Sequence, residues 1–302
     1  MYITIFMNEY LLVLLNGILD TSRWTWNSMT FQVDWYTNYF WGLVLISLLV
    51  WLLEIVFPWR KSQGIIRKDF WLDGFYMFFN FFIFSVAING FYQLISLFFQ
   101  QLGVSEKSLA ILNLSALPML LQLFVFFVVL DFVQWLTHIM LHRFSFLWKF
   151  HQVHHSVKEM GFSAHLRYHW MENILYKPLK TFGVMLLGGF EPEQAYIVHF
   201  IAISIGHFNH SNIKITWGPF KYLVNNPVMH LYHHAYHFPE EHPNGVNFGI
   251  SLSVWDYIFK TNHIAEDSGT IKLGFPGDDQ MPKNFMGQLK YGFKSANHKD
   301  RF

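Results

Sequence analysis

Residues 117–155, LPMLLQLFVFFVVLDFVQWLTHIMLHRFSFLWKFHQVHH, decide the fold of this chain. The first part of the stretch, 117–140, is almost entirely apolar, and about 20 such residues in a helix are enough to cross the hydrocarbon core of a membrane. The first histidines of the chain, His138 and His142, stand where this apolar run ends. The stretch therefore predicts a membrane-spanning helix that leads directly into a histidine-rich region.

The composition of the whole chain is that of a membrane protein. Of its 302 residues, 53% are hydrophobic and only 14% are charged, whereas a soluble domain carries roughly a quarter charged residues. The net charge of +1 gives no basic field of the kind that drives nucleic-acid binding. Because the chain has no cysteine, disulfides, thiolate-held metal sites and a cysteine nucleophile are excluded, and any metal must be held by nitrogen or oxygen.

Two more segments, 39–57 and 75–99, are as long and as apolar as 117–140, so each predicts a transmembrane helix. A fourth candidate, 3–19, is interrupted by polar residues and either spans the membrane or lies in its interface. A fifth apolar segment, 182–206, is broken at Glu191-Pro192-Glu193, which leaves two pieces too short to span separately. We interpret this last segment as a re-entrant or interfacial helical hairpin.

The loops predict the orientation of these helices. The loop after the 39–57 span carries four basic residues, whereas the loop at 100–116 carries only Lys107, and basic loops stay on the cytoplasmic side. Counting spans from there places everything after about residue 140 on the cytoplasmic side. The sequence thus predicts an all-α, multi-pass integral membrane protein with about four transmembrane helices, the hairpin, and a cytoplasmic histidine-rich helical cap. The four basic residues of the first loop are Arg60, Lys61, Arg67 and Lys68.

The histidines are unevenly distributed along the chain. None precedes His138, and 14 of the 17 fall between His138 and His237. Residues three and four apart share one face of a helix, so the HxxxH and HxxHH groups should each aim their imidazoles at one point. A transition metal takes about four to six ligands, so ten such histidines suffice for two metals. The ten candidate ligands are His138, His142, His151, His154, His155, His207, His210, His230, His233 and His234.

Carboxylates are scarce in the same part of the chain. Between residues 138 and 237 there is no aspartate, and none of the four glutamates forms the ExxH pair that soluble di-iron bundles use. No HExxH motif of a zinc protease occurs either. Any metal site in this region is therefore dominated by imidazole.

The histidine groups and the residues around them resemble a known family. The HSN at 210–212, the GPxxYxxNxPxxHxxHH block at 218–234 and the NFG and WDxxF segments that follow are similar to motifs of the membrane fatty acid hydroxylase and sterol desaturase superfamily. The 218–234 block is closest to the alkylglycerol monooxygenase-like and bacterial sterol desaturase-like branch. The chain departs from the family pattern at Ile139, Trp170 and Lys260, none of which is a candidate ligand.

The resemblance implies a single fatty acid hydroxylase-like domain over residues 1–302. Within it, 1–137 is mainly the transmembrane anchor, 138–262 is the histidine-box catalytic region, and 263–302 is a cytoplasmic tail. The implied cofactor is a di-iron centre held by the ten histidines, with O2 as co-substrate and electrons from an external reductase, ferredoxin or cytochrome. The implied reaction oxidises an unactivated C–H bond of a membrane lipid or sterol-like substrate. Hydroxylation is the first expectation, and desaturation and ether-lipid cleavage are alternatives.

Four further residues are candidates for supporting the ligands. Asp131 lies about two turns before His138 on the same predicted helix, and a carboxylate inside a membrane segment needs a partner. Asp131 either accepts a hydrogen bond from a ligand N–H or makes a helix-packing hydrogen bond. Arg167, His169 and Glu172, which form an RxHxxE arrangement, either anchor the cap or line the site.

Two other functional classes use histidines in membranes. A non-catalytic metal-binding or metal-transport protein would place them, with acids, along the transmembrane path, yet the spans at 39–57 and 75–99 contain none. A haem-binding electron carrier needs only axial histidines, and the HxxHH triplets exceed that need. The metal content of purified protein discriminates among the three classes.

Overall fold

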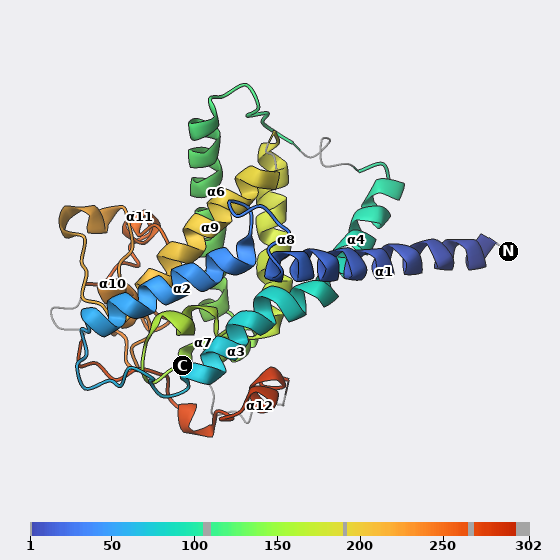
Figure 1. Cartoon of the computed structure of the whole chain (residues 1–302). Helices are drawn as coiled ribbons and strands as arrows, with labels where there is room; N and C mark the ends of the chain where they lie inside the picture. The colour runs from blue at the N-terminus through green and yellow to red at the C-terminus, as the bar shows by residue number, and fades with distance from the viewer. Residues whose placement is uncertain (1, 105–109, 190–191, 265–268, 294–302) are drawn as a thin grey trace.

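The computed structural model describes residues 2–104, 110–189, 192–264 and 269–293, and every regular element among them is a helix (Figure 1). The only extended pairing in these ranges is two isolated bridges, Val224 with Leu252 and Ala235 with Leu273. The all-α prediction is therefore confirmed for the described part of the chain.

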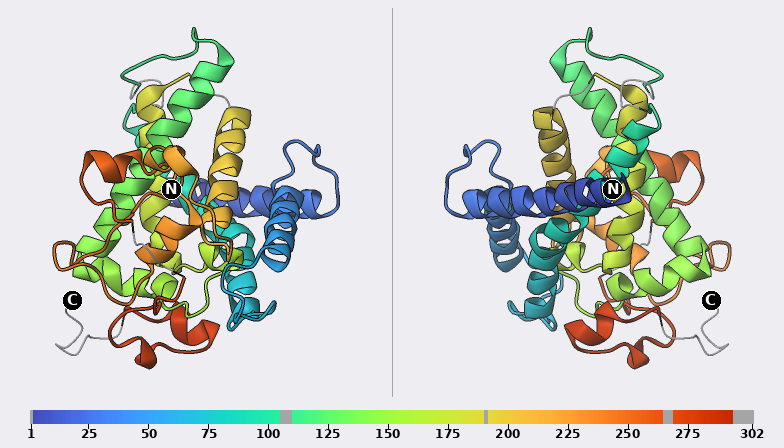
Figure 2. Two further views of the ribbon diagram at one scale, coloured as in Figure 1. Left: turned by 90° about the vertical axis from the view of Figure 1, so that its left-hand side faces the viewer. Right: turned by 90° about the vertical axis from the view of Figure 1, so that its right-hand side faces the viewer.

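Three helical segments are long and apolar enough to cross a membrane, and they are the three that the sequence marks most clearly. They are α2 (Tyr39–Val56), the continuous segment α3–η1–α4 (Phe70–Gln101), and α6 (Met119–Arg143). The N-terminal helix α1 (Tyr2–Met29) is not among them, although it covers the predicted fourth candidate. It packs along α4 and projects away from the rest of the molecule (Figures 1 and 2).

Local sequence explains where these helices begin and end. Asn38 caps α2 by accepting a hydrogen bond from the backbone N–H of Trp41, and Pro58 follows the helix with no N–H to continue it. Pro118 stands directly before α6. The segment Phe70–Gln101 contains one π-helical turn, η1 (Phe79–Ile83), between α3 (Phe70–Phe78) and α4 (Phe84–Gln101). Such turns widen a helix by one residue and concentrate at functional sites.

The segment 182–206, which was predicted as a hairpin, lies in two longer helices, α8 (Trp170–Leu187) and α9 (Pro192–Asn209). The chain breaks between them where the Glu-Pro-Glu sequence stands, and Glu191 itself lies outside the described residues. Both helices pack against α6, so the three together form the body on which the remaining short helices are arranged.

Short helices and loops form the rest of the cap, at the end of α6 where the histidines begin (Figure 2). Residues of the predicted tail pack into this region, because Phe275 and Met281 share a buried cluster with Trp148 and Val153. Lys107, the basic residue of the 100–116 loop, lies outside the described ranges, as do residues 265–268 and 294–302 of the predicted tail. The short helices are α7 (Ser145–His155), η2 (Phe162–Leu166), η3 (Gly218–Tyr222), α10 (Pro227–His233), α11 (Val254–Ile258), η4 (Asp278–Gln280) and α12 (Phe285–Leu289).

Candidate metal centre

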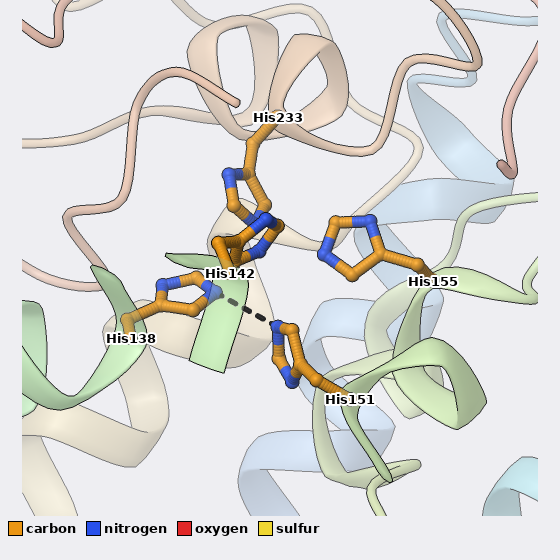
Figure 3. A group of neighbouring side chains, drawn as sticks. All are labelled: His138, His142, His151, His155 and His233. Carbon is orange, nitrogen blue, oxygen red and sulfur yellow. Dashed lines mark hydrogen bonds between the residues drawn. The ribbon is translucent and has the colours of Figure 1, made fainter. Parts of the chain in front are cut away.

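Nine of the ten candidate ligands come together in two buried groups, in each of which the ring nitrogens lie within 4.8 Å of one another. Figure 3 shows the first group, whose rings come from α6, α7 and α10 and point toward a common centre. Both groups consist of imidazole alone. The five-histidine group is His138, His142, His151, His155 and His233, and the four-histidine group is His154, His210, His230 and His234.

Each HxxHH motif divides its histidines between the two groups. On α7, the first and last histidines, His151 and His155, belong to the five-histidine group, whereas His154 belongs to the four-histidine group. On α10 the division is reversed, because His233 alone joins the five-histidine group. The prediction that all three histidines of a triplet aim at one point is therefore wrong, because each triplet contributes to both groups. Positions i and i+4 are about 40° apart around a helix, but i+3 and i+4 are about 100° apart.

The two groups adjoin each other. The rings of His155 and His234, one from each group, stack with centroids 4.3 Å apart. The spanning helix α6 gives His138 and His142 to the five-histidine group, and the end of α9 gives His210 to the other. Two ions bound in these groups would be neighbours.

Hydrogen bonds to the ring nitrogens show that the groups suit a cation. The Nδ1 of His138 faces the carbonyl oxygen of Phe248 at 2.7 Å, and the Nδ1 of His151 faces a carboxylate oxygen of Glu172 at 2.9 Å. Each Nδ1 therefore carries the proton, which leaves two bare Nε2 atoms only 3.1 Å apart. Two lone pairs in this position repel each other unless a cation lies between them.

The four-histidine group repeats this arrangement. The Nδ1 atoms of His154 and His210 face the carbonyl oxygens of Arg167 and Gly206 at 3.1 and 2.7 Å, and their Nε2 atoms are 3.3 Å apart. Two imidazole nitrogens about 2.1 Å from one ion and at right angles lie about 3.0 Å apart, so these spacings fit a shared transition metal.

Other ring nitrogens have no hydrogen-bond partner among the residues that the structure describes. Both ring nitrogens of His142, His155 and His234 are buried and make no hydrogen bond. Burial, reinforced by the neighbouring rings, holds the pKa of His155 and His234 well below the ordinary value, so the rings are neutral. Neutral imidazoles with unused lone pairs in a dry interior are costly unless they bind a metal. The donor set and its burial therefore fit metal ligation.

Comparison with known proteins agrees with this geometry. Residues 123–261 match the family model described as fatty acid hydroxylase. This part of the chain, a little under half of its length, is therefore similar to the fatty acid hydroxylase family. The matched region contains all nine histidines of the two groups.

Curated relatives carry related names. The chain is 27% identical over 183 residues to ornithine lipid hydroxylase OlsE of Rhizobium tropici, which covers 61% of this chain and 54% of the relative. It is 29% identical over 140 residues to alkylglycerol monooxygenase of Homo sapiens, covering 45% and 29%. The Danio rerio alkylglycerol monooxygenase is 26% identical over 240 residues, covering 76% and 47%. The chain thus spans about half or less of the length of these relatives. No solved structure matches it.

The three residues of the RxHxxE arrangement lie in different positions relative to the two histidine groups. Glu172 contacts a ligand directly through His151. The Arg167 side chain is buried and bonds Asp69, Asp73 and Ser156, while its backbone carbonyl is the partner of His154.

The third member, His169, contacts neither histidine group through its ring nitrogens. Its Nε2 lies 2.8 Å from the carbonyl oxygen of Leu289, so it ties the C-terminal segment to the start of α8. The sequence left open whether these residues line the site or anchor the cap. Glu172 contacts a candidate ligand, whereas the side chains of Arg167 and His169 anchor the cap.

The carboxylate of Asp131 makes packing hydrogen bonds. It accepts from the backbone N–H groups of Ser251 and Leu252 at 3.2 Å each and from the indole of Trp255 at 2.9 Å. Among its hydrogen bonds in the described residues, none involves a histidine ring. Asp131 therefore fixes the 251–255 segment on α6, which is the second of the two readings of this residue.

Asp256 is a supporting residue that the sequence analysis did not single out. Its buried carboxylate accepts hydrogen bonds from the indole of Trp135 and from the backbone N–H groups of Phe248 and Gly249, at 2.8 to 3.0 Å. The carbonyl of Phe248 in turn faces His138. Asp256 thus holds in place the backbone that orients a candidate ligand, and the WDxxF motif around it was the available signal.

The tenth candidate, His207, lies outside both groups. Its Nδ1 faces the Nδ1 of His165 at 2.9 Å, and its Nε2 lies 3.2 Å from the hydroxyl of Ser47 on α2. Both ring nitrogens are therefore engaged away from the two centres. The reason is its position on α9: it is three residues, or about 60° around the helix axis, from His210.

A cavity of about 950 Å³ leads to the histidines. His138 and His151 of the five-histidine group and His154 and His210 of the four-histidine group line it. Its other walls come from α1, α2, α3–η1–α4, α6, α8 and α9. The cavity is large enough for a substantial part of a lipid molecule.

Proposed function

We propose that this protein is an O2-dependent membrane oxygenase that uses two iron ions to oxidise an unactivated C–H bond of a lipid. The observation that carries the proposal is the pair of adjoining all-imidazole groups, each with bare nitrogens facing one another and each contributing two histidines to the lining of a cavity. The match of the histidine-rich region to the fatty acid hydroxylase family model supports it.

The nine histidines would hold the two ions. When bound, the two iron ions would activate O2, and an external donor protein would supply the electrons. Transition metals take about four to six ligands, so the four-histidine group leaves room for a further ligand from the cavity. The carbonyls of Phe248, Arg167 and Gly206 and the carboxylate of Glu172 hold the ring protons on Nδ1 and keep each Nε2 available.

Hydroxylation is the proposed reaction. One oxygen atom of O2 enters the C–H bond to give an alcohol, and the other leaves as water after two electrons and two protons have been delivered. The names of the relatives, a lipid hydroxylase and a monooxygenase, support this outcome. Desaturation and ether-lipid cleavage use the same ligands and electrons, so the product decides among them.

We place the cap on the cytoplasmic side. The loop after α2 that carries the basic residues lies against the cap, because Arg60 bonds the side chain of Asn212 and the carbonyl of Met160. The basic loop and the histidine groups therefore share one side, and basic loops favour the cytoplasm. In this arrangement the chain forms one domain, in which residues 1–137 are mainly the membrane anchor and residues 138–262 hold the two metal ions. The external donor protein then delivers electrons to the metal ions from the cytoplasmic side.

The metal content of detergent-purified protein tests the proposal. Protein from iron-replete cells should contain about two iron ions per chain and show no haem absorption. Total lipid extracts from cells with and without the gene should differ by species shifted by the mass of one oxygen atom. Protein without iron, or with a haem band, would refute the metal assignment. Iron without any change in lipids would favour the non-catalytic metal-binding alternative.

A further inference from the structure

The walls of the cavity differ in chemistry. On the sides formed by α6 and α9 much of the lining is apolar, with Asp131, Gln134 and His199 among the polar exceptions. The apolar residues include Phe126, Leu130, Val198 and Ile203. Such walls suit a hydrocarbon chain. The side formed by α8 is polar instead, which is unexpected in a cavity that would hold only hydrocarbon.

The polar residues of α8 form one continuous stripe. They recur at helical spacing, so one face of the helix points into the cavity over its length. The stripe begins beside the five-histidine group, because Glu172 contacts His151. Its members are Glu172, Asn173, Tyr176, Lys177, Lys180 and Thr181.

The two lysines of the stripe lie at a defined distance from the metal groups. A helix rises 1.5 Å per residue, so Lys177 and Lys180 are about 7.5 and 12 Å from Glu172 along the helix axis. A group bound by both lysines would therefore be several bonds away from a carbon held at the histidines.

No carboxylate among the described residues forms a salt bridge with either lysine, although Asp131 is near enough to Lys180 to favour its charged form. The Nζ of Lys177 donates to the hydroxyl of Ser85 at 3.0 Å, and the Nζ of Lys180 lies 5.4 Å from the ring centroid of Tyr176. Burial lowers the pKa of each lysine to about 8. Both remain largely charged at neutral pH, and an anion would relieve the cost of burying them.

The carboxylates that line the cavity are already engaged elsewhere. Glu172 is bound to His151, and Asp131 accepts three hydrogen bonds from the 251–255 segment. Asp20 is exposed and lies 3.7 Å from the guanidinium of Arg23. Asp131 therefore offsets part of the charge of Lys180 from a distance, and no carboxylate among the described residues binds either ammonium group directly, which leaves both able to bind a ligand.

We propose that Lys177 and Lys180 bind an anionic oxygen group of the lipid substrate, a phosphate or a carboxylate. The apolar walls then hold the adjoining hydrocarbon, and the distance from the lysines to the histidines selects the carbon that is oxidised. This assignment rests on the proposed function in that the bound lipid is the molecule to be oxidised. It predicts oxidation close to the anionic group rather than at the far end of a chain.

Equilibrium binding to the purified full chain in a neutral detergent tests the assignment. Three probes share one acyl chain: oleic acid, monooleoyl lysophosphatidic acid and neutral monooleoylglycerol. At least one anionic probe should bind more tightly than the neutral one. Replacing both lysines by methionine should weaken that probe about 10- to 100-fold, since hydrogen bonds to charged groups are worth about 1.5–3 kcal/mol. Arginine at both positions should restore it.

Lys214→Met is the matched control, because Lys214 is exposed and does not line the cavity. Its binding should equal that of the unaltered protein. Preference for only one of the two anionic probes identifies that acid as the ligand class. Equal binding of the neutral probe by the unaltered protein overturns the proposal, and this result does not depend on whether the methionine variant folds. Anionic binding that survives in the folded double variant overturns it too.

The measurement needs neither iron nor turnover. A chain that binds the anionic probe through the lysines but contains no iron would refute the oxygenase and leave the lysine site standing. A chain that contains two iron ions but does not prefer an anionic probe would refute the lysine site and leave the proposed oxygenase standing.

Discussion

The two histidine groups share the helices α7 and α10 but differ in what holds them. The five-histidine group takes His138 and His142 from the spanning helix α6, and one of its ligands is backed by the carboxylate of Glu172. The four-histidine group takes no ligand from a candidate span, and its backing partners are main-chain carbonyls.

The two groups therefore differ in how their ligands are supported: one partly by a side-chain carboxylate, the other by backbone carbonyls. The five-histidine group is attached to a candidate membrane span and has an ionisable group next to one candidate ligand, so replacing that group should alter the site without removing a ligand. The four-histidine group depends on the path of the backbone around Arg167 and Gly206. Substitutions of the residues that support the ligands should therefore affect the two groups unequally, whereas substitution of a ligand in either group should cost that group its ion.

The largest effects should follow from His154→Ala and His155→Ala. These adjacent residues serve different groups, so each variant should lose about one of two bound iron ions and more than about 100-fold in lipid oxidation. Iron analysis and oxygen-dependent turnover measure both effects. His237→Ala is the control, because His237 is exposed and belongs to neither group. A His154→Ala variant that keeps turnover would contradict the assignment.

Glu172→Gln should sharpen the contrast between the groups. The neutral amide no longer supports the ring of His151 as a carboxylate does, so one iron ion should bind about 10- to 100-fold more weakly. The other ion should be unaffected, and titration with a competing chelator separates the two. Glu193→Gln, an exposed glutamate on α9, should change neither affinity. Equal weakening of both ions would remove the distinction drawn above.

Asp131→Asn should reduce stability rather than metal content. The carboxylate bonds two backbone N–H groups and an indole, and weakening these bonds should cost about 2 kcal/mol of unfolding free energy. Thermal unfolding in detergent measures the loss, and iron analysis should still find two ions. Asp20→Asn, at an exposed aspartate, should leave the melting temperature unchanged. Loss of an iron ion without loss of stability would show that Asp131 supports a ligand instead.

The smallest effect should come from His207→Ala. Because the His207 ring faces Ser47 and His165, the variant should keep two iron ions and turnover within a few-fold of the unaltered protein. His210→Ala, three residues further along α9, should lose an ion. Similar losses in both variants would return His207 to the ligand set.

The sequence predicted the three clear spans and the break between α8 and α9 because each depends on a local pattern. Long apolar runs and a Glu-Pro-Glu interruption need no tertiary information. The same holds for the clustering of histidines at three- and four-residue spacing. The division of each HxxHH between two centres could not be predicted, because it depends on how α7 and α10 face each other.

Contacts between distant parts of the chain were also beyond the sequence. The basic residues Arg60 and Arg67 supported the orientation argument as loop charges, yet both make hydrogen bonds to the cap. The C-terminal segment was predicted as a tail, yet Phe275 and Met281 are buried in it. The WDxxF motif marked Asp256, but the motif could not reveal its role, because Asp256 reaches His138 only through the backbone of Phe248.

The π-helical turn η1 has a mechanical consequence. Its buried Asn80 donates hydrogen bonds to the carbonyls of Leu166 and Tyr168 and accepts one from Asn173. The segment bound by Asn80 contains Arg167 and Glu172, each of which contacts one candidate ligand, His154 and His151 respectively. Hydrogen bonds therefore connect a candidate membrane span to both histidine groups. We expect bilayer thickness, which shifts a span along the membrane normal, to alter turnover, and reconstitution in lipids of graded chain length would measure this.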